Sequence, residues 1–269
     1  MIGAVKARYQ VRVAAGVVLA ISLVGCGSGD DRPGPAAPPV TDVPSTSAAP
    51  ATVAPTTTVP TAPVYSLATA KVRSVDVFNS PVQPEPARAL DNPQPSGAAP
   101  GSTFPLRMLV VEERGDWLKV LLPIRPNGSS GWIRRSTVDL ESHTYRAVVE
   151  LGEHRITVWE GDKVVLQEPV GVGASGRTPT TQGLFYTTEL FEVGASQQGA
   201  YGPYAFALSG FSEVLYSFGG GTGVLGIHGT SDPSGLGRDV SSGCIRMSNA
   251  GITKLANLLP LGVPVEIKA

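Results

Sequence analysis

The chain has 269 residues, which is long enough for one or two domains with hydrophobic cores. Its 21 Lys and Arg residues nearly balance 22 Asp and Glu residues, and the resulting net charge of −1 argues against a nucleic-acid-binding protein, which needs a basic surface to offset phosphate charge. Two Cys residues are too few for a disulfide framework or a Cys-rich zinc site.

The first 25 residues are typical of an export signal. Three basic residues and no acidic one precede an apolar run over residues 13–25, which is shorter than the roughly 20 residues that a membrane-spanning helix needs. The run leads into Leu-Val-Gly-Cys26, a tetrapeptide that resembles a bacterial lipobox. The resemblance implies that residues 1–25 are removed and that Cys26 is acylated and anchors the protein to the membrane. An ordinary signal peptide with an incidental Cys26 is the alternative.

Residues 26–64 are expected to form a disordered tether that starts at the acylated Cys. Nine Pro residues fall among the 38 residues from 27 to 64, and this stretch has no aromatic residue, Leu or Ile. Such a segment buries too little apolar surface to offset the entropy lost on ordering. A lipid anchor followed by a long tether predicts an exported protein, held on the outer face of the cell membrane and acting in the cell wall.

Residues 65–142 have the pattern of a small all-β module. The predicted strands cover residues 75–78, 106–111, 117–122 and 131–133. Short strands at this spacing predict a small barrel, and the sequence GDWLKV followed by NGSSGWI resembles bacterial SH3-like domains. Trp117 and Trp132 are expected to pack in its core. Direct binding of this module to the cell wall and a role as a rigid spacer both stay open.

Residues 143–269 are predicted to form a second domain that is mainly β with one short helix. The predicted strands cover residues 145–151, 154–160, 163–172, 184–188, 224–227 and 262–267. Ser248 or Asn249 is a suitable N-cap for a helix that carries Ile252 and Leu255 on one face.

The stretch 191–223 is rich in Gly, Tyr and Phe and has no clear periodicity, which predicts a lid or a wall over a site. Tyr201 and Tyr204 are candidate substrate contacts in this stretch, with ordinary packing as the alternative.

The chemistry of the chain is expected to centre on one thiol and one imidazole. If Cys26 is acylated, Cys244 is the remaining free thiol, and a nearby imidazole could take its proton and activate it as a nucleophile. His143 lies in a polar stretch between the modules and His154 at the start of a strand, so both are expected to face solvent. His228 ends an apolar strand and is therefore the candidate base. Burial of Cys244 as a small apolar residue is the alternative.

Glycine next to Cys244 would let a substrate carbonyl approach the main chain, where adjacent N–H groups could form an oxyanion hole. Ser241 and Ser242 could equally form a turn, and Arg246 could be a surface ion pair. From these residues alone, catalysis and a purely structural role both remain open.

Two motifs resemble a known family. Ile-His228-Gly-Thr is followed by Ser-Ser-Gly-Cys244-Ile-Arg-Met-Ser-Asn, with the Cys 16 positions after the His. This pair resembles the catalytic domain of L,D-transpeptidases, which are bacterial cell-wall enzymes. The resemblance extends over residues 145–267. Residues 178–185, TPTTQGLF, are similar to the family's TPxGxF segment with one extra residue.

The resemblance implies a role for each matching residue. Cys244 corresponds to the nucleophile and His228 to the general base, while the carbonyl of Gly229 would orient the imidazole. The main-chain N–H groups of Gly243 and Cys244 correspond to the oxyanion hole. The family fold implied is a β-rich catalytic domain with a short C-terminal helix, and no metal or organic cofactor is implied.

The chain departs from the family at Ser242, where many relatives have a second His, and this leaves pH dependence and rate open. Arg246 matches a family Arg and could hold a substrate carboxylate through a two-pronged contact or form a structural ion pair. The implied reaction cross-links peptidoglycan stem peptides through a thioester on Cys244. The resemblance also implies that β-lactams of the carbapenem type acylate Cys244.

Two other functions compete with this one. A carboxypeptidase or peptidase would use the same Cys–His pair with water in place of the acceptor amine. The second alternative is a non-catalytic lipoprotein that binds the cell wall. Ser242, in place of the His of many relatives, is the observation that favours it. The acceptor, the stem-peptide variant, the role of the small module, the oligomeric state and the need for the activity in growth are not determined by the sequence.

Overall fold

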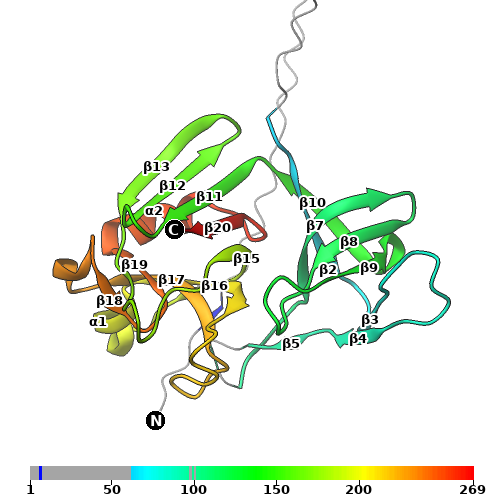
Figure 1. Ribbon diagram of the computed structural model, residues 1–269, viewed down its shortest axis with the longest axis horizontal. Coiled ribbons are helices and arrows are strands. Elements are labelled where there is room, and N and C mark those ends of the chain that lie inside the picture. Colours follow the sequence, from blue (N-terminus) through cyan, green and yellow to red (C-terminus); the bar gives the residue numbers. More distant parts are fainter. Residues whose placement is uncertain (1–5, 8–61, 97–98, 100) are drawn as a thin grey trace, which may run out of the picture. The chain divides into compact units, whose positions relative to one another are not determined.

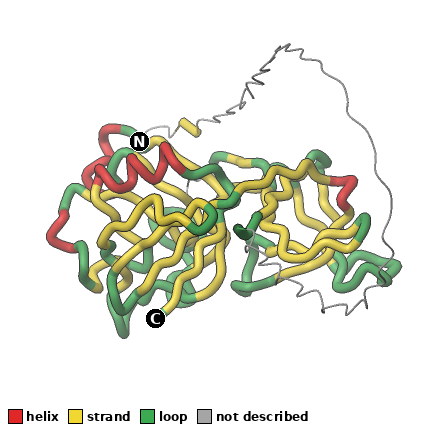
Figure 2. The backbone as a smooth tube through the Cα atoms, turned by 90° about the horizontal axis from the view of Figure 1, so that it is seen from above, coloured by secondary structure: helices red, strands yellow, loops and turns green. Residues whose placement is uncertain are grey.

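The computed structural model describes residues 6–7, 62–96, 99 and 101–269. The predicted export signal (apart from residues 6–7), Cys26 and nearly all of the predicted tether lie outside these residues. Strands make up most of the described chain, and helices are confined to a few short segments (Figure 2). The prediction of a mainly β protein is therefore confirmed.

The larger sheet has nine strands. Eight of them follow the order β13-β12-β11-β20-β15-β16-β17-β19, and the two-residue β1 pairs with β15 (Figure 1). The two parallel pairs in this sheet are β11–β20 and β17–β19, and its other pairs are antiparallel. Its strands are β1 (Lys6–Ala7), β11 (Tyr145–Glu150), β12 (Arg155–Glu160), β13 (Lys163–Pro169), β15 (Gly183–Glu192), β16 (Tyr204–Phe211), β17 (Val224–Thr230), β19 (Ile245–Ser248) and β20 (Pro264–Lys268).

The predicted C-terminal helix is present as α2 (Asn249–Leu258). Ser248 is its N-cap, and the Ser248 hydroxyl accepts a hydrogen bond of 2.9 Å from the Gly251 N–H, which satisfies one of the free amides of the first turn. Ile252 and Leu255 are fully buried against β16, β17 and β19. Burial of this apolar stripe stabilises a helix too short to persist alone.

A second, five-stranded antiparallel sheet covers much of residues 65–142, and we call it the N-terminal sheet. Its order is β10-β2-β7-β8-β9. Leu118 and Val120 of β8 are fully buried in the core, whereas Trp117 is half-buried on the other face of the strand, which corrects the expectation that it packs in the core. Trp132 is buried in this region, and the SH3-like identity of the module stays a prediction. The strands and the one helical turn of this region are β2 (Tyr65–Ala70), β3 (Ser74–Val77), β4 (Arg88–Asp91), β5 (Gln94–Pro95), β6 (Thr103–Phe104), β7 (Arg107–Arg114), β8 (Trp117–Leu121), β9 (Ser130–Arg134), η1 (Arg135–Thr137) and β10 (Val138–His143).

The expectation that residues 191–223 form an aperiodic lid is wrong for their middle part. β16 occupies residues 204–211 and lies in the interior of the larger sheet, between β15 and β17. Residues 206–210 are all buried, so both faces of the strand are covered and no polar–apolar alternation marks it in the sequence. The remaining short elements are β14 (Val172–Gly173), η2 (Ala195–Gln197), α1 (Gln198–Tyr201), η3 (Pro233–Gly235) and β18 (Asp239–Ser241).

Buried polar contacts join the N-terminal sheet to the larger sheet. The Tyr186 hydroxyl on β15 is fully buried, 2.9 Å from the carbonyl oxygen of Arg107 and 3.2 Å from that of Leu121. Close by on β15, the Glu189 carboxylate accepts a 3.1 Å hydrogen bond from the Ser96 hydroxyl. These contacts make the two sheets part of one compact unit.

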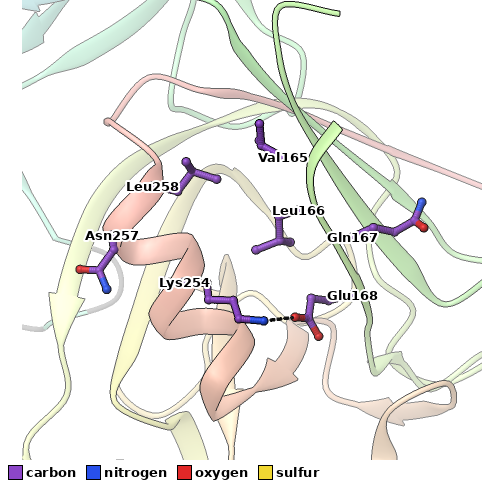
Figure 3. A pocket seen from close by; sticks show the side chains of 7 residues that line it. All are labelled: Val165, Leu166, Gln167, Glu168, Lys254, Asn257 and Leu258. Atoms are coloured by element: carbon purple, nitrogen blue, oxygen red, sulfur yellow. Dashed lines mark hydrogen bonds and ion pairs between the residues drawn. The ribbon is translucent and has the colours of Figure 1, made fainter. Parts of the chain in front are cut away.

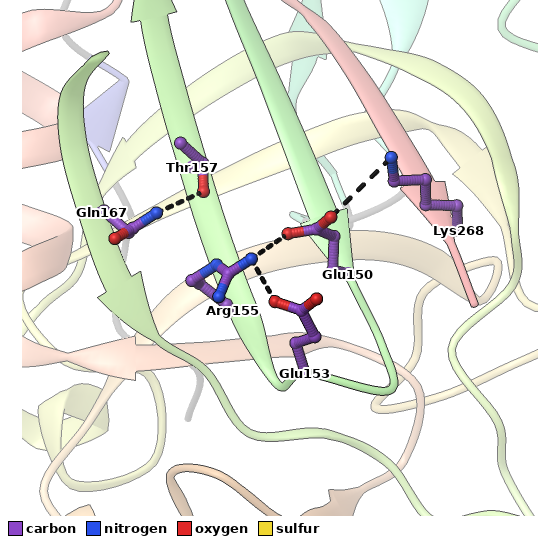
Figure 4. Close-up of polar contacts among 6 residues, drawn as sticks. All are labelled: Glu150, Glu153, Arg155, Thr157, Gln167 and Lys268. Atoms are coloured by element: carbon purple, nitrogen blue, oxygen red, sulfur yellow. Dashed lines mark hydrogen bonds and ion pairs between the residues drawn. The ribbon is translucent and has the colours of Figure 1, made fainter.

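Charged side chains gather at the turn between β11 and β12 (Figure 4). The Arg155 guanidinium pairs with Glu150 at 2.6 Å and also with Glu153, and Lys268 on β20 lies 3.8 Å from Glu150. Arg155–Glu153 is the most exposed of these pairs, and ion pairs on the surface contribute little individually, about 1 kcal/mol or less. Within the described residues, no helix combines the length and the apolar character needed to cross a bilayer.

Candidate active site

His228 and Cys244 lie on adjoining segments of the larger sheet. β17 and β19 run parallel and side by side, with Ile227 opposite Ile245 (Figure 1). Cys244 directly precedes Ile245 and is level with Gly226, and a Cβ on Gly226 would lie 3.8 Å from the Cys244 Sγ. Because side chains alternate along a strand, His228 and Cys244 share one face, and Ile227 and Ile245 point into the core on the other.

This placement sets the separation between the candidate base and the candidate nucleophile. His228 is two residues along and one strand across from Cys244, which corresponds to about 8 Å between their Cα atoms. An imidazole and a thiol that extend from the same face can bridge much of that distance, directly or through one water. The arrangement is therefore compatible with proton transfer from sulfur to imidazole.

The His228 imidazole is held in one orientation. Its Nδ1 lies 2.7 Å from the Gly229 carbonyl oxygen, an acceptor, so Nδ1 carries the proton and Nε2 keeps its lone pair. The Tyr201 ring packs against it edge to face, with ring centroids 5.0 Å apart. Burial, and to a smaller extent the charge of Arg246, lower the pKa of His228 to about 4 despite the opposing Gly229 bond. His228 is thus neutral at pH 7 and able to accept a proton.

Gly229 fits a crowded position next to this imidazole. A Cβ there would lie 2.5 Å from the Asn249 side-chain oxygen and 2.9 Å from the Gly202 Cα. A larger residue would therefore displace the main chain whose carbonyl orients His228.

The Cys244 thiol is also shielded from water. The residue is half-buried, and burial of its sulfur raises the pKa above the ordinary value of 9.0. A main-chain hydrogen bond from Gly226 and the charge of Arg246 act in the opposite direction without cancelling this effect. In the free protein the pair is therefore a neutral thiol beside a neutral imidazole, and proton transfer has to accompany attack on a substrate.

The loop before Cys244 depends on Ser241 and on the backbone conformation of Gly243. Gly243 has φ +114°, which side-chain-bearing residues rarely adopt. Its N–H donates to the Ser241 hydroxyl at 3.1 Å, and that hydroxyl donates to the Cys244 carbonyl at 2.5 Å. The Gly243 N–H therefore already has a partner in the chain, which leaves the N–H of Cys244 as the candidate oxyanion donor.

The segment similar to the family's TPxGxF motif packs beside this loop. The Thr178 hydroxyl donates to the Ser241 carbonyl at 2.9 Å, and the Thr180 hydroxyl accepts from the Gly173 N–H at 2.8 Å. The Pro179 carbonyl oxygen is 3.6 Å from where a Gly243 Cβ would stand. Residues 178–180 thus support the main chain that presents Cys244.

Arg246 and Ser242 flank the nucleophile in different ways. Arg246 is opposite His228 in the register, is half-buried, and lowers the pKa of both His228 and Cys244. Its Nε is buried and has no hydrogen-bond partner among the described residues. Ser242 is exposed in the bend before Cys244. A buried guanidinium nitrogen without a partner is suited to an anionic group of a ligand.

The structure separates the other candidate residues. Tyr201 touches His228, whereas Tyr204 packs against the core of the larger sheet and fits the packing alternative. His143 and His154 are half-buried instead of solvent-facing. His143 packs loosely against Tyr65 and Tyr145, and the His154 Nε2 lies 2.8 Å from the carboxylate of Asp239 at the start of β18.

A groove of about 600 Å³ lies elsewhere, between β13 and α2 (Figure 3). Leu166 and Leu258 line it, and Lys254 pairs with Glu168 at 3.2 Å across it. It contains neither His228 nor Cys244. In the part of the chain that the structure describes, no cluster of three or more His, Cys, Asp or Glu side chains is arranged to hold a metal ion.

Comparison with known proteins supports the resemblance. Residues 144–267 match the family model of the L,D-transpeptidase catalytic domain, YkuD. Two curated proteins named as candidate L,D-transpeptidases of the YkuD type match this chain over 123 residues, which is 46% of it. The protein of Bacillus licheniformis is 34% identical and that of Bacillus subtilis 32%. The match spans 65% of the length of each of these relatives, so the similarity concerns the YkuD-type segment, residues 144–267.

Solved structures of L,D-transpeptidases are also similar to the chain. An L,D-transpeptidase from Mycobacterium smegmatis matches at 16% identity and a TM-score of 0.39, over 59% of this chain and 80% of the other. The catalytic domain of an E. faecium L,D-transpeptidase matches at 21% identity and a TM-score of 0.33, over 46% of this chain and 95% of the other. Both scores are below 0.5, so these two structures fix neither the fold nor the function of this chain.

Two residues of the site, Gly226 and Asn249, are not among the site residues that the sequence predicts. Gly226 is adjacent to the Cys244 sulfur, and Asn249 is adjacent to Gly229. Gly226 precedes His228 by two positions, so strand alternation would have placed it on the same face. Asn249 carries no comparable signal, because it also begins α2 and its position depends on how the helix packs on β17.

Proposed function

We propose that the protein is an exported, Cys-dependent L,D-transpeptidase that cross-links peptidoglycan stem peptides. The observation that carries the proposal is the parallel register of β17 and β19, which brings His228 and Cys244 to one face. The Gly229 carbonyl leaves Nε2 of His228 as the free proton acceptor. The match of residues 144–267 to the L,D-transpeptidase family model supports the same reaction class.

In the first half-reaction, Cys244 attacks the carbonyl of the third residue of a donor stem peptide. The thiol proton moves to His228, the S–C bond forms, and the C–N bond to the terminal D-alanine breaks as His228 returns the proton to the leaving amine. In the second half-reaction, an amine of a neighbouring stem attacks the thioester. His228 accepts the amine proton, the new C–N bond forms, and Cys244 leaves and is reprotonated.

Several neighbouring groups have proposed roles in this reaction. The Cys244 N–H would stabilise the oxyanion, and the positive φ of Gly243 sets the direction of that N–H. The Arg246 guanidinium would bind a carboxylate of the donor peptide, and Tyr201 and Ser242 would contact the substrate. Tyr204 is left out of this set because it packs against the core of the larger sheet.

The proposed organisation of the chain follows the reaction. Residues 1–25 would direct export, and lipid-modified Cys26 with residues 26–64 would tether the protein to the outer face of the membrane. Residues 65–142 would form an SH3-like module and residues 143–269 the catalytic domain. β-Lactams of the carbapenem type would acylate Cys244, because their strained amide is an electrophile of the same type as the donor peptide.

Mass spectrometry of the intact full-length chain with a carbapenem tests the proposal. A Cys26→Ser background leaves Cys244 as the single thiol. We expect one covalent adduct, absent in Cys244→Ala and strongly slowed in His228→Ala. His143→Ala is the matched control, because that His lies against Tyr65 and Tyr145 instead of beside Cys244, and it should keep the wild-type rate.

The same protein is then given stem tetrapeptides. A cross-linked dimer is the expected product. Release of D-alanine without a dimer would favour the carboxypeptidase, whereas wall binding retained in Cys244→Ala, with no product from the wild type, would favour the binding protein. The absence of both adduct and dimer with the wild type would overturn the enzymatic proposal.

A further inference from the structure

The loop between β16 and β17, residues 212–223, leads directly into the strand that carries Gly226 and His228. β17 begins at Val224, directly after this loop, and Gly226 beside the Cys244 sulfur is the third residue of the strand. Three residues of strand, roughly 10 Å, therefore separate Gly223 from Gly226. We call residues 212–223 the β16–β17 loop. It carries the exposed aromatic side chains Tyr216 and Phe218.

The ends of this loop meet at a narrow neck. The Ser212 N–H donates to the Gly223 carbonyl at 2.8 Å, and the Ser212 hydroxyl accepts from the Leu215 N–H at 3.0 Å. Gly223 has φ +72°, and a Cβ there would be 2.0 Å from the Leu215 carbonyl oxygen. The neck leaves no room for a side chain, so its geometry is set by main-chain contacts.

A side chain of the N-terminal sheet region spans this neck. Arg125, in the connection between β8 and β9, donates to the Ser212 carbonyl at 2.8 Å and to the Thr222 carbonyl at 3.2 Å. Its guanidinium also stacks on the rings of Phe211 and Tyr216, 4.8 and 4.6 Å from their centroids. The Arg125 guanidinium thus contacts both ends of the β16–β17 loop and two aromatic rings, one at the end of β16 and one in the loop.

A second residue of the same connection fixes the end of β16. The Asn127 amide nitrogen donates to the Phe211 carbonyl at 2.8 Å, and its oxygen accepts from the Phe211 N–H at 2.9 Å. This two-way contact satisfies both main-chain groups of the last residue of the strand. Arg125 and Asn127 therefore hold the start of the β16–β17 loop, and Arg125 holds its end as well.

We propose that Arg125 is a positioning residue for the site around Cys244, because it holds the β16–β17 loop in the shape that a peptide donor meets on its way to the thiol. This inference rests on the proposed function of Cys244. It makes the N-terminal sheet a working part of the catalytic unit and not only a spacer. The thiol itself is unaffected, since Arg125 acts on the loop and not on Cys244 or His228.

Full-length protein in the Cys26→Ser background is used for the test, as wild type, Arg125→Ala and Arg125→Lys. Arg134→Ala is the matched control, because Arg134 stacks on Trp117, 3.8 Å from its ring centroid, within the N-terminal sheet. Hydrogen exchange reports on the amides of residues 212–223. Alkylation of Cys244 by small iodoacetamide and by a bulky maleimide reports on access, and stem-tetrapeptide kinetics give kcat/KM.

In Arg125→Ala we expect exchange of the loop amides about tenfold faster or more, the usual effect of losing a charge-assisted hydrogen bond. The ratio of bulky to small alkylation rates should change while the iodoacetamide rate stays at the wild-type value, and kcat/KM should fall about tenfold through KM. Arg125→Lys should recover only part, since Lys lacks the fork that reaches two carbonyls. Arg134→Ala should match the wild type.

Unchanged loop exchange in Arg125→Ala would overturn the inference, as would faster exchange without any change in the alkylation ratio. An equal effect in Arg134→Ala would also overturn it, because the cause would then be general loosening of the N-terminal sheet. If Arg125→Ala fails to fold, Arg125→Lys decides the question, with changes of the same sign and smaller size expected in loop exchange and in the alkylation ratio. A wild type without peptide activity refutes only the proposed function, because exchange and the alkylation ratio still decide the role of Arg125.

Discussion

The resting protonation state of Cys244 and His228 makes a quantitative prediction for thiol reactivity. Burial raises the pKa of Cys244 above 9.0 and lowers that of His228 to about 4. A pKa of 9.0 leaves about 1% of a thiol ionised at pH 7, so Cys244 carries less thiolate than that. A preformed thiolate–imidazolium pair would instead keep most of the sulfur ionised at neutral pH.

Alkylation by iodoacetamide distinguishes these two states, because only the thiolate reacts. In full-length Cys26→Ser protein, followed by intact mass, we expect the rate at Cys244 to rise about tenfold per pH unit from about pH 6 to about pH 9. Urea-unfolded protein is the control, and its rate should begin to level off above about pH 9, once the thiol passes its ordinary pKa of 9.0. His228→Ala should keep the steep profile, while its acylation by a carbapenem should be slow.

A rate plateau that starts below pH 7 in the folded protein would refute this account. It would mean that the sulfur is already ionised, and that a charged partner stabilises it more strongly than the Gly226 bond and Arg246 do. A plateau that disappears in His228→Ala would identify that partner as the imidazolium.

Three further predictions concern single residues. Burial raises the pKa of Glu189 to about 7 from 4.5. Between these two pH values the folded protein keeps a proton on Glu189 that the unfolded protein has lost. The contribution of this proton to stability is full below pH 4.5 and disappears as the pH rises through 7. Urea denaturation should show the free energy of unfolding of the wild type, relative to that of Glu189→Gln, falling by about 3 kcal/mol between these pH values, at about 1.4 kcal/mol per pH unit. A difference that does not change with pH would contradict the raised pKa of Glu189. Tyr186→Phe removes a buried hydroxyl bonded to main-chain carbonyls and should lower the free energy of unfolding by about 1–2 kcal/mol, so an unchanged urea midpoint would count against this bond. Gly243 and Gly237 have φ +114° and +78° and space for a methyl group, so Gly243→Ala and its control Gly237→Ala should each lower the free energy of unfolding by about 1–3 kcal/mol. Only Gly243→Ala should also slow acylation by a carbapenem. Equal slowing in both variants would reject a specific role for the Gly243 backbone.

The sequence was informative wherever local chemistry sets the structure. Leu118 and Val120 alternate with half-exposed neighbours on β8 because one face of that strand packs on a core. Ser248 begins α2 because its hydroxyl caps the first turn. The pairing of a Cys-containing and a His-containing motif, and their resemblance to L,D-transpeptidases, likewise required only the order and spacing of residues.

Tertiary structure decided the features that depend on distant parts of the chain. β16 is covered on both faces, so its sequence has no alternation, and the stretch 191–223 that contains it predicts a lid or a wall instead of a strand. Tyr201 touches His228 while Tyr204 packs against the core, and the sequence does not distinguish these two nearby tyrosines. The pKa values of His228 and Cys244 follow from burial, and the contact of Arg125 with Ser212 joins residues 87 positions apart, which no local pattern encodes.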